Sequence, residues 1–164
     1  MKTLYLIRHA KSSWDHEGLT DFERPLNKRG EGDAPLMGGV LRQHGARPEL
    51  IRASAATRAI TTAEQLATVL DFPPDEVIVD EGMYGAAAND LLKIVRSFPD
   101  TVQEAMLVGH NPTLHILAER IAGFDEDNLP TCGVICIDFM VETWHEVPDT
   151  IGKIRYYEYP KKYK

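Results

Sequence analysis

The sequence has few of the features that mark secreted, membrane-spanning or disulfide-stabilised proteins. It contains two cysteines, Cys132 and Cys136, in 164 residues, which is too few for a disulfide framework. The first apolar run covers only residues 4–7 before Arg8 and His9, and this is too short for a signal-peptide core. No other run approaches the length of a membrane span. We therefore expect a cytoplasmic protein with no membrane partner.

A surplus of basic residues is also missing. The chain has 18 Lys and Arg against 25 Asp and Glu, a formal net charge of −7. A general nucleic-acid binder needs a broad basic face, so we expect no nucleic-acid partner. The exception is the N-terminal segment, because residues 1–30 carry six basic and four acidic side chains. An anion handled by this protein is expected to bind near that segment.

No strong metal-binding or cofactor-binding pattern occurs in the sequence. If residues 132–136 form a strand, the two cysteines point to one face but lie too far apart for a disulfide. We expect them to be buried free thiols. His110 and His115 are five residues apart, which misses the spacing that pairs histidines on one helical face, and the HExxH motif is absent. We therefore expect no bound metal and no cofactor.

Short apolar runs alternate with longer segments of helical period, which is typical of an α/β sheet with helices packed on its faces. No linker divides residues 1–164, so we expect one domain. The predicted strands are Thr3–Ile7, Glu49–Arg52, Glu76–Asp80, Ala105–Gly109, Val134–Phe139 and Lys153–Tyr159. The last two are expected to pair antiparallel across the turn region Pro148–Gly152.

Four helices are predicted between these strands. The first is capped by Asn27, runs to His44 and stops at Gly45; the second covers Ala56–Leu70; the third starts at Asn89; and the fourth runs from Pro112 to Ala122. Residues 161–164, Lys-Lys-Tyr-Lys, are expected to form a solvated charged tail rather than a docking site.

Two of the predicted strands end in a histidine, His9 after residues 4–8 and His110 after residues 106–109. Ligands of open α/β sheets bind outside the carboxyl ends of the strands. If the two strands are parallel, both histidines can face one cavity. Arg58 gives a second indication, since it lies in the first turn of a predicted helix, where a cation opposes the helix dipole unless an anion binds there. Together with Arg8, these residues suggest a phosphoryl-binding site.

Three motifs then carry a family resemblance. Residues 8–10 (RHA) after an apolar strand resemble the RHG signature of the histidine phosphatase superfamily. Residues 54–63 (SAATRAITTA) resemble the family segment S-x-x-x-R-A-x-x-T-A, and residues 108–112 (VGHNP) resemble its second-histidine segment. The short chain and residues 24–26 (RPL) are similar to SixA-type phosphohistidine phosphatases. Two positions differ from the pattern: Ala10 replaces a glycine, and Asp15 stands where many members have asparagine.

The resemblance implies a phosphoglycerate mutase-like fold, a three-layer α/β sandwich with a mostly parallel central sheet. It also implies that His9 is the nucleophile and forms a phosphohistidine intermediate, as a neutral imidazole can. The charge clamp around the phosphoryl group would consist of Arg8, Arg58 and His110.

Three further residues are candidates. Ser13 is expected to contact the phosphate. Arg24 is either a site residue or a solvated loop residue. Glu81 opens residues 81–85 (EGMYG), which resemble an E-x-x-Y-G segment that carries the family's general acid; its alternative is a solvent-facing carboxylate.

The expected activity is a metal-independent phosphatase acting on phosphohistidine of a protein. The chain has no long insertion between its elements, so we expect an open site that admits a phosphorylated protein, unless residues 10–24 roof it over. The alternative enzyme is a small-molecule phosphomonoesterase of the same fold, whose substrate would be a small phosphate ester. A third alternative is a non-catalytic phosphate-binding module.

Overall fold

The computed structural model describes residues 1–147 and 151–164 and contains one mixed six-stranded sheet. The strand order is β3-β2-β4-β1-β5-β6. The strands are β1 (Lys2–Arg8), β2 (Leu50–Ser54), β3 (Ile78–Asp80), β4 (Glu104–Gly109), β5 (Val134–Phe139) and β6 (Lys153–Glu158). The first four are mutually parallel, while β5 runs antiparallel to both β1 and β6.

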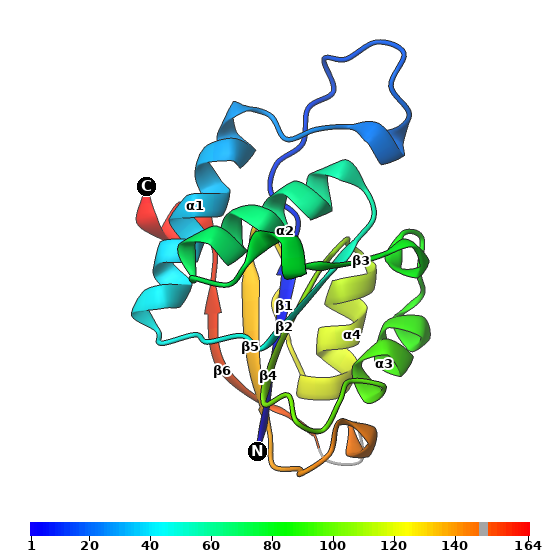
Figure 1. The fold of residues 1–164 in the computed structure, drawn as a ribbon, viewed down its shortest axis with the longest axis vertical. Coiled ribbons are helices and arrows are strands. Elements are labelled where there is room, and N and C mark those ends of the chain that lie inside the picture. Colours follow the sequence, from blue (N-terminus) through cyan, green and yellow to red (C-terminus); the bar gives the residue numbers. More distant parts are fainter. Residues whose placement is uncertain (148–150) are drawn as a thin grey trace.

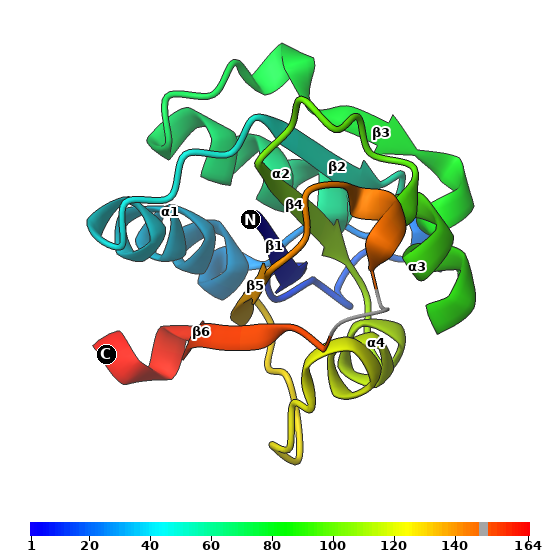
Figure 2. The same cartoon turned by 90° about the horizontal axis from the view of Figure 1, so that it is seen from below.

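Four helices cover the two faces of this sheet, so the molecule has three layers (Figures 1 and 2). They are α1 (Lys28–Gln43), α2 (Thr57–Val69), α3 (Ala88–Arg96) and α4 (Thr113–Ala122). Figure 2 shows α1 and α2 on one side of the sheet and α3 and α4 on the other. The expected three-layer α/β fold is therefore confirmed.

The element boundaries differ from the predicted ones by a few residues. Strand β3 begins at Ile78 instead of Glu76, because residues 74–76 form a short 3-10 turn led by Pro74. Helix α1 begins after Asn27, whose side chain accepts the N–H of Gly30 as expected. The predicted antiparallel pairing of β5 and β6 is confirmed, whereas the turn expected at Pro148–Gly152 falls partly on residues 148–150, outside the described residues.

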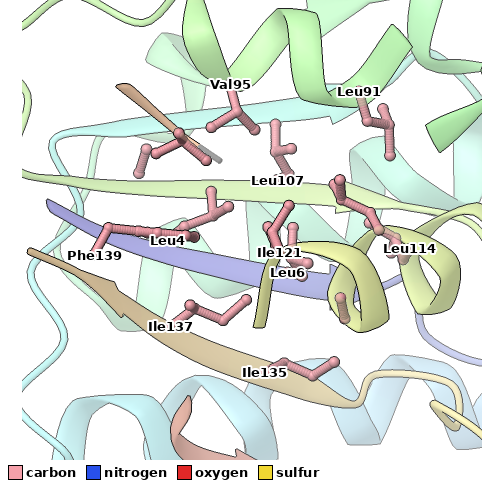
Figure 3. Close-up of a cluster of buried hydrophobic side chains, with 14 of the residues drawn as sticks. Leu4, Leu6, Leu91, Val95, Leu107, Leu114, Ile121, Ile135, Ile137 and Phe139 are labelled. Atoms are coloured by element: carbon pink, nitrogen blue, oxygen red, sulfur yellow. The ribbon is translucent and has the colours of Figure 1, made fainter. Parts of the chain in front are cut away.

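The strands carry apolar side chains on both faces because each face is covered by helices. Along β1, Leu4 and Leu6 point toward α3 and α4, and Tyr5 and Ile7 point toward α1 and α2. Figure 3 shows the first of these clusters, where Leu6 and Leu107 of neighbouring strands meet α3 and α4. Burial on both faces fixes the register of the central strands, since a slip of one residue would exchange the two faces.

This register places the two histidine-bearing strand ends side by side. Strands β1 and β4 are neighbours, and Arg8 is the partner of Gly109. The next residues are His9 and His110, and the N–H of His9 donates to the carbonyl of Gly109 at 3.0 Å. The sheet therefore brings both histidines to one edge.

Cys132 and Cys136 are buried free thiols, as expected, and Cys132 lies just before β5 rather than within it. Burial raises the pKa of Cys136 to about 11. Across residues 1–147 and 151–164, no group of three or more His, Cys, Asp or Glu side chains is arranged to hold a metal ion. None of the helices in this part of the chain combines the length and apolarity needed to cross a bilayer.

Candidate active site

His9 lies at the carboxyl end of β1, and its side chain is 7% exposed. Its Nδ1 is 2.7 Å from the carbonyl oxygen of Ala10. A carbonyl only accepts hydrogen bonds, so in the neutral ring Nδ1 carries the proton and Nε2 keeps its lone pair. The Nε–H of Arg58 donates toward that lone pair at 3.4 Å. Both neighbours therefore favour the same tautomer, the one with the proton on Nδ1 and the lone pair on Nε2.

The surroundings of His9 also keep the ring neutral. Burial is the main reason that its pKa falls to about 3; the Ala10 carbonyl opposes this fall, and nearby cations add to it. The lowered pKa leaves the lone pair on Nε2 unprotonated across the neutral pH range, which is the form that a nucleophilic imidazole needs.

His110 faces His9 from the end of β4, with ring centroids 5.2 Å apart. Its Nε2 shares a hydrogen bond of 2.8 Å with the hydroxyl of Ser54, the last residue of β2. Burial, followed by the charge of Arg58, lowers the pKa of His110 to about 4. Three parallel strand ends, those of β1, β2 and β4, thus position the two imidazoles.

Arg58 enters the site from the first turn of α2 and is held there by Asp21. Its Nη1 donates to the main-chain carbonyl of Asp21 at 2.7 Å, and its Nη2 donates to the Asp21 carboxylate at 3.0 Å. The hydroxyl of Tyr84 donates to the same carboxylate at 2.7 Å. These contacts, led by that of Tyr84, hold the pKa of Asp21 below its usual value. The Asp21 carboxylate is therefore already paired with the Arg58 guanidinium, which is expected to bind a phosphoryl group.

Arg24 is buried and lines the same cavity as His9, so it is not a solvated loop residue. Its side chain packs under the ring of Trp14, 3.4 Å from the ring centroid, and donates one bond to the hydroxyl of Ser12. Its Nε and Nη1, like the Nε of Arg8, are buried without a hydrogen-bond partner in the described part of the chain. Buried donors without partners are costly, and the oxygens of a phosphoryl group would satisfy those that face the cavity.

These side chains surround one cavity of about 580 Å³. Its lining residues are Arg8, His9, Lys11, Ser12, Trp14, Asp21, Arg24, Arg58, Tyr84, Gly85, His110, Asn111 and Thr131. Five of the seven residues proposed from the sequence are thereby brought together: Arg8, His9, Arg24, Arg58 and His110.

The other two predicted residues lie outside this cavity. Ser13 lines a different depression. It follows Ser12 in extended backbone, where consecutive side chains point to opposite sides. Ser12, and not Ser13, therefore lines the active-site cavity. Glu81 is exposed at the start of the 3-10 turn Glu81–Met83, and this turn directs Tyr84 and Gly85 toward the site instead. Glu81 thus occupies the solvent-facing position that was its alternative.

The segment between β1 and α1 also changes the expectation of an open site. It extends beyond the sheet edge, above α2 in Figure 1. Four of its residues line the cavity after Lys11, and Asp21 reaches across to Arg58 and Tyr84. The edge of Phe22 packs against Tyr84, with ring centroids 4.9 Å apart. Residues 12–24 therefore form a wall that covers one side of the site, so the pocket is less open than expected.

Several site residues were not found from the sequence. Asp21 begins the short 3-10 turn Asp21–Glu23, and Tyr84 directly follows the 3-10 turn Glu81–Met83. Such short turns leave no periodicity in the sequence. Thr62 was within a recognised motif, yet its function is structural: its hydroxyl accepts the N–H of Ala10 at 2.9 Å and donates to the carbonyl of Arg58 at 2.8 Å. It thereby links the loop after β1 to the first turn of α2.

A sequence model of the histidine phosphatase superfamily (branch 1) matches residues 4–100, more than half of the chain. The protein belongs to the histidine phosphatase superfamily. An uncharacterized chloroplastic protein of Arabidopsis thaliana is 33% identical over 154 residues, covering 88% of this chain and 70% of the relative.

Solved structures agree with this membership. A structure from Agrobacterium tumefaciens assigned as the phosphohistidine phosphatase SixA is 27% identical, with a TM-score of 0.83, covering 97% of this chain and 98% of the other. The protein histidine phosphatase SixA complexed with tungstate has a TM-score of 0.77 at 18% identity, covering 99% of each chain, and shows a shared fold. The chain is thus a SixA-type member of the superfamily, and this membership supports phosphatase activity.

The two departures from the family pattern have different surroundings. Ala10 is fully buried, and its backbone makes the hydrogen bonds to His9 and Thr62, so its small side chain is accommodated. Asp15 is exposed and does not line the active-site cavity. In this structure the side chain at position 15 therefore adds no charge to the phosphate site.

Proposed function

We propose that this protein hydrolyses phosphohistidine on a protein through a covalent intermediate on His9. The observation that carries the proposal is the state of His9, whose Nε2 lone pair points to Arg58 while Nδ1–H is held by Ala10. A buried, neutral imidazole among guanidinium groups is suited to attack an anionic phosphorus centre, because the cations stabilise the charge on the transferring oxygens.

In the first step, Nε2 of His9 forms a bond to phosphorus as the P–N bond of the substrate breaks. The electron pair of that bond leaves with the substrate imidazole, which takes a proton from the solvent or from an acid in the cavity. His9 becomes an N-phosphoimidazolium and keeps its proton on Nδ1. The Ala10 carbonyl stabilises this cationic ring by accepting the Nδ1–H.

In the second step, water attacks phosphorus on the phosphorylated His9. A P–O bond forms, the P–Nε2 bond breaks, and the electron pair returns to Nε2 as the ring becomes neutral again. The proton lost by the water leaves with inorganic phosphate or the solvent. Throughout both steps Arg8, Arg24, Arg58 and His110 are proposed to contact the phosphoryl oxygens.

The choice of phosphohistidine rests on the similarity to SixA structures and on the leaving group. Imidazole leaves more readily than an alkoxide, so this substrate has less need of a general acid. Glu81, which the resemblance implied as that acid, lies outside the cavity. A cytoplasmic location and a requirement for no metal remain predictions.

Phosphate release from a phosphohistidine-bearing protein and from small phosphate esters, measured in parallel as kcat/KM, tests the proposal, with the His9→Ala variant as the blank. We expect a preference for the phosphoprotein and no turnover by His9→Ala. A higher kcat/KM for a small ester would assign the protein to the phosphomonoesterases instead. Binding of phosphate ligands without turnover of either substrate would show a non-catalytic binding module.

The phosphomonoesterase alternative is supported by one observation. Tyr84 lines the cavity, and its hydroxyl, which donates to the Asp21 carboxylate, carries a proton that can pass to a leaving alkoxide. If the protein is an esterase, Tyr84→Phe should lower kcat for esters more than for phosphohistidine.

A further inference from the structure

A second cavity, of about 490 Å³, adjoins the active-site cavity. Arg8, Lys11 and Thr131 line both. The other residues around the second cavity are Arg29, Asp33, Asn128, Pro130, Tyr159, Pro160, Lys161 and Lys164. A ligand that places a phosphoryl group on His9 can therefore extend into this second cavity past the shared residues.

Three distant parts of the sequence build the second cavity. The N-terminal turn of α1 supplies Arg29. The loop before β5 and the C-terminal segment supply further lining residues, Asn128, Pro130 and Thr131 from the loop and Tyr159, Pro160, Lys161 and Lys164 from the segment. The carboxylate of Asp33 joins two of these parts, since it lies 3.7 Å from Arg29 and 2.6 Å from Nζ of Lys164. Figure 1 shows the C-terminus beside α1. Lys161 and Lys164 thus line a cavity, so the C-terminal segment is not the free tail expected from the sequence.

The second cavity is cationic in an acidic protein. Five Lys and Arg side chains line it, against the single carboxylate of Asp33, whereas the whole chain has a net charge of −7. Asp33 is already shared by Arg29 and Lys164. Lys11 and Lys161 form no ion pair within the described part of the chain. The local surplus of positive charge therefore favours an anionic ligand.

We propose that the second cavity binds an additional anionic group of the substrate, a carboxylate or a phosphate, while the phosphoryl group occupies the active site. This inference rests on the proposed phosphatase function and concerns the part of the substrate that does not react. The group has two possible sources: acidic side chains that flank phosphohistidine in a protein, or a second phosphate on a small molecule. In both cases Lys161 and Arg29 would contact it away from the reacting atoms.

The test compares the double variant Arg29→Ala, Lys161→Ala with wild type on two substrate pairs. One pair is a phosphohistidine peptide flanked by Asp and Glu, and the same peptide with Asn and Gln. The other pair is hexane-1,6-diol bisphosphate and hexyl phosphate. Lys153→Ala is the control, because Lys153 is an exposed residue at the start of β6 that lines neither cavity.

We expect wild type to favour the more anionic member of one pair, and the double variant to lose about tenfold in kcat/KM for that member alone. The pair that responds identifies the source of the anion. Equal kcat/KM values within both pairs for wild type would overturn the inference, and so would an equal loss on both members in the double variant.

A binding measurement separates this inference from the proposed function. Calorimetry with the four ligands on the His9→Ala protein, with and without the two cavity substitutions, needs no turnover. Tighter binding of the more anionic ligand that disappears in the triple variant supports the second cavity even if wild type hydrolyses none of the substrates. Binding that is insensitive to Arg29 and Lys161 overturns it even if wild type is an active phosphatase.

Discussion

At the scale of single residues, the reactivity of His9 depends on where its one proton lies. The Ala10 carbonyl and the Arg58 Nε–H hold the ring in one tautomer, and burial keeps it neutral. The cost of this arrangement should be visible as a loss of stability in acid, because the folded protein cannot accept the proton that an unfolded histidine binds.

Replacing His9 with Gln tests that cost. The folded pKa of about 3 lies below the ordinary value of 6.5, so the unfolded state binds more protons below pH 6.5 and the folded state loses stability as the pH falls toward 3. Between pH 7.5 and pH 5, wild type should lose about 2 kcal/mol that His9→Gln does not lose. Urea unfolding at both pH values measures the difference. The same loss in both proteins would mean that the pKa of His9 is ordinary.

Asp21 gives a second prediction at this scale. Its carboxylate is hydrogen-bonded to Arg58, where an incoming phosphoryl oxygen would bind. Removing the negative charge of Asp21 should therefore strengthen the binding of anions. Asp21→Asn is expected to tighten inhibition by tungstate about three- to tenfold. Glu17→Gln is the matched control, as Glu17 is exposed in the same segment and does not line the cavity. Weaker inhibition in Asp21→Asn would show instead that Asp21 holds Arg58 in place for the ligand.

The residues that could be predicted from the sequence are those whose place follows from strand and helix ends. His9 and His110 follow buried strands, and Arg58 begins a helix, so the fold alone brings them together. Asp21 and Tyr84 could not be predicted, because each lies at a short 3-10 turn and the two turns are held together by contacts between them. Glu81 was inferred from the family resemblance, and the short 3-10 turn Glu81–Met83 leaves it in solvent while Tyr84 lines the cavity.

At the scale of elements, the site depends on how α1 and α2 are joined to the loop after β1. Thr62 of α2 accepts the N–H of Ala10, and the backbone N–H of Asn27, at the start of α1, donates to the carbonyl of Lys11 at 3.0 Å. Gly30 allows this approach, since a Cβ built there would lie 2.1 Å from the Lys11 carbonyl oxygen. Both helices are therefore in direct contact with the loop that carries His9.

Substitution of Gly30 tests this coupling. Gly30→Ala must displace either α1 or Lys11, so we expect a loss of more than about 1 kcal/mol in unfolding free energy and a loss of at least about tenfold in kcat/KM. In Gly32→Ala, by contrast, the new methyl group meets no atom within 4 Å. That control should gain about 0.5–1 kcal/mol, as glycine is unfavourable inside a helix, and keep its activity. Full activity in Gly30→Ala would mean that the loop does not depend on α1.

At the scale of the whole molecule, the three-layer fold could be predicted well, because apolar strands alternate with helices throughout the chain. The strand order could not be predicted, because it depends on how the helical connections cross over the faces of the sheet from one strand to the next. That order has a functional consequence: β4 lies between β1 and β2, so the ends of these three strands form one wall of the site. The basic second cavity also arises only on folding, because its Lys and Arg side chains come from distant parts of a chain that is acidic as a whole.

The metal-free scheme makes a prediction for the whole protein. In the proposed scheme, the arginines that line the cavity would stabilise the charge that a metal stabilises in other phosphatases. Incubation with EDTA should leave kcat/KM within about twofold of its starting value, because no step of the scheme uses a metal. A twofold change corresponds to about 0.4 kcal/mol of activation free energy. A rate that collapsed in EDTA and returned on addition of a divalent metal would contradict the scheme.

The most direct test of the account is to trap the intermediate. Wild-type protein mixed with phosphorylated substrate is quenched in alkaline denaturant, which preserves phosphohistidine, and the modified peptide is mapped by mass spectrometry. We predict one phosphoryl group on His9, its absence in His9→Ala, and its retention in His115→Ala, since His115 lies outside the active-site cavity. Turnover without a phosphoryl group on His9, or with the group on His110, would contradict the central claim that His9 is the nucleophile.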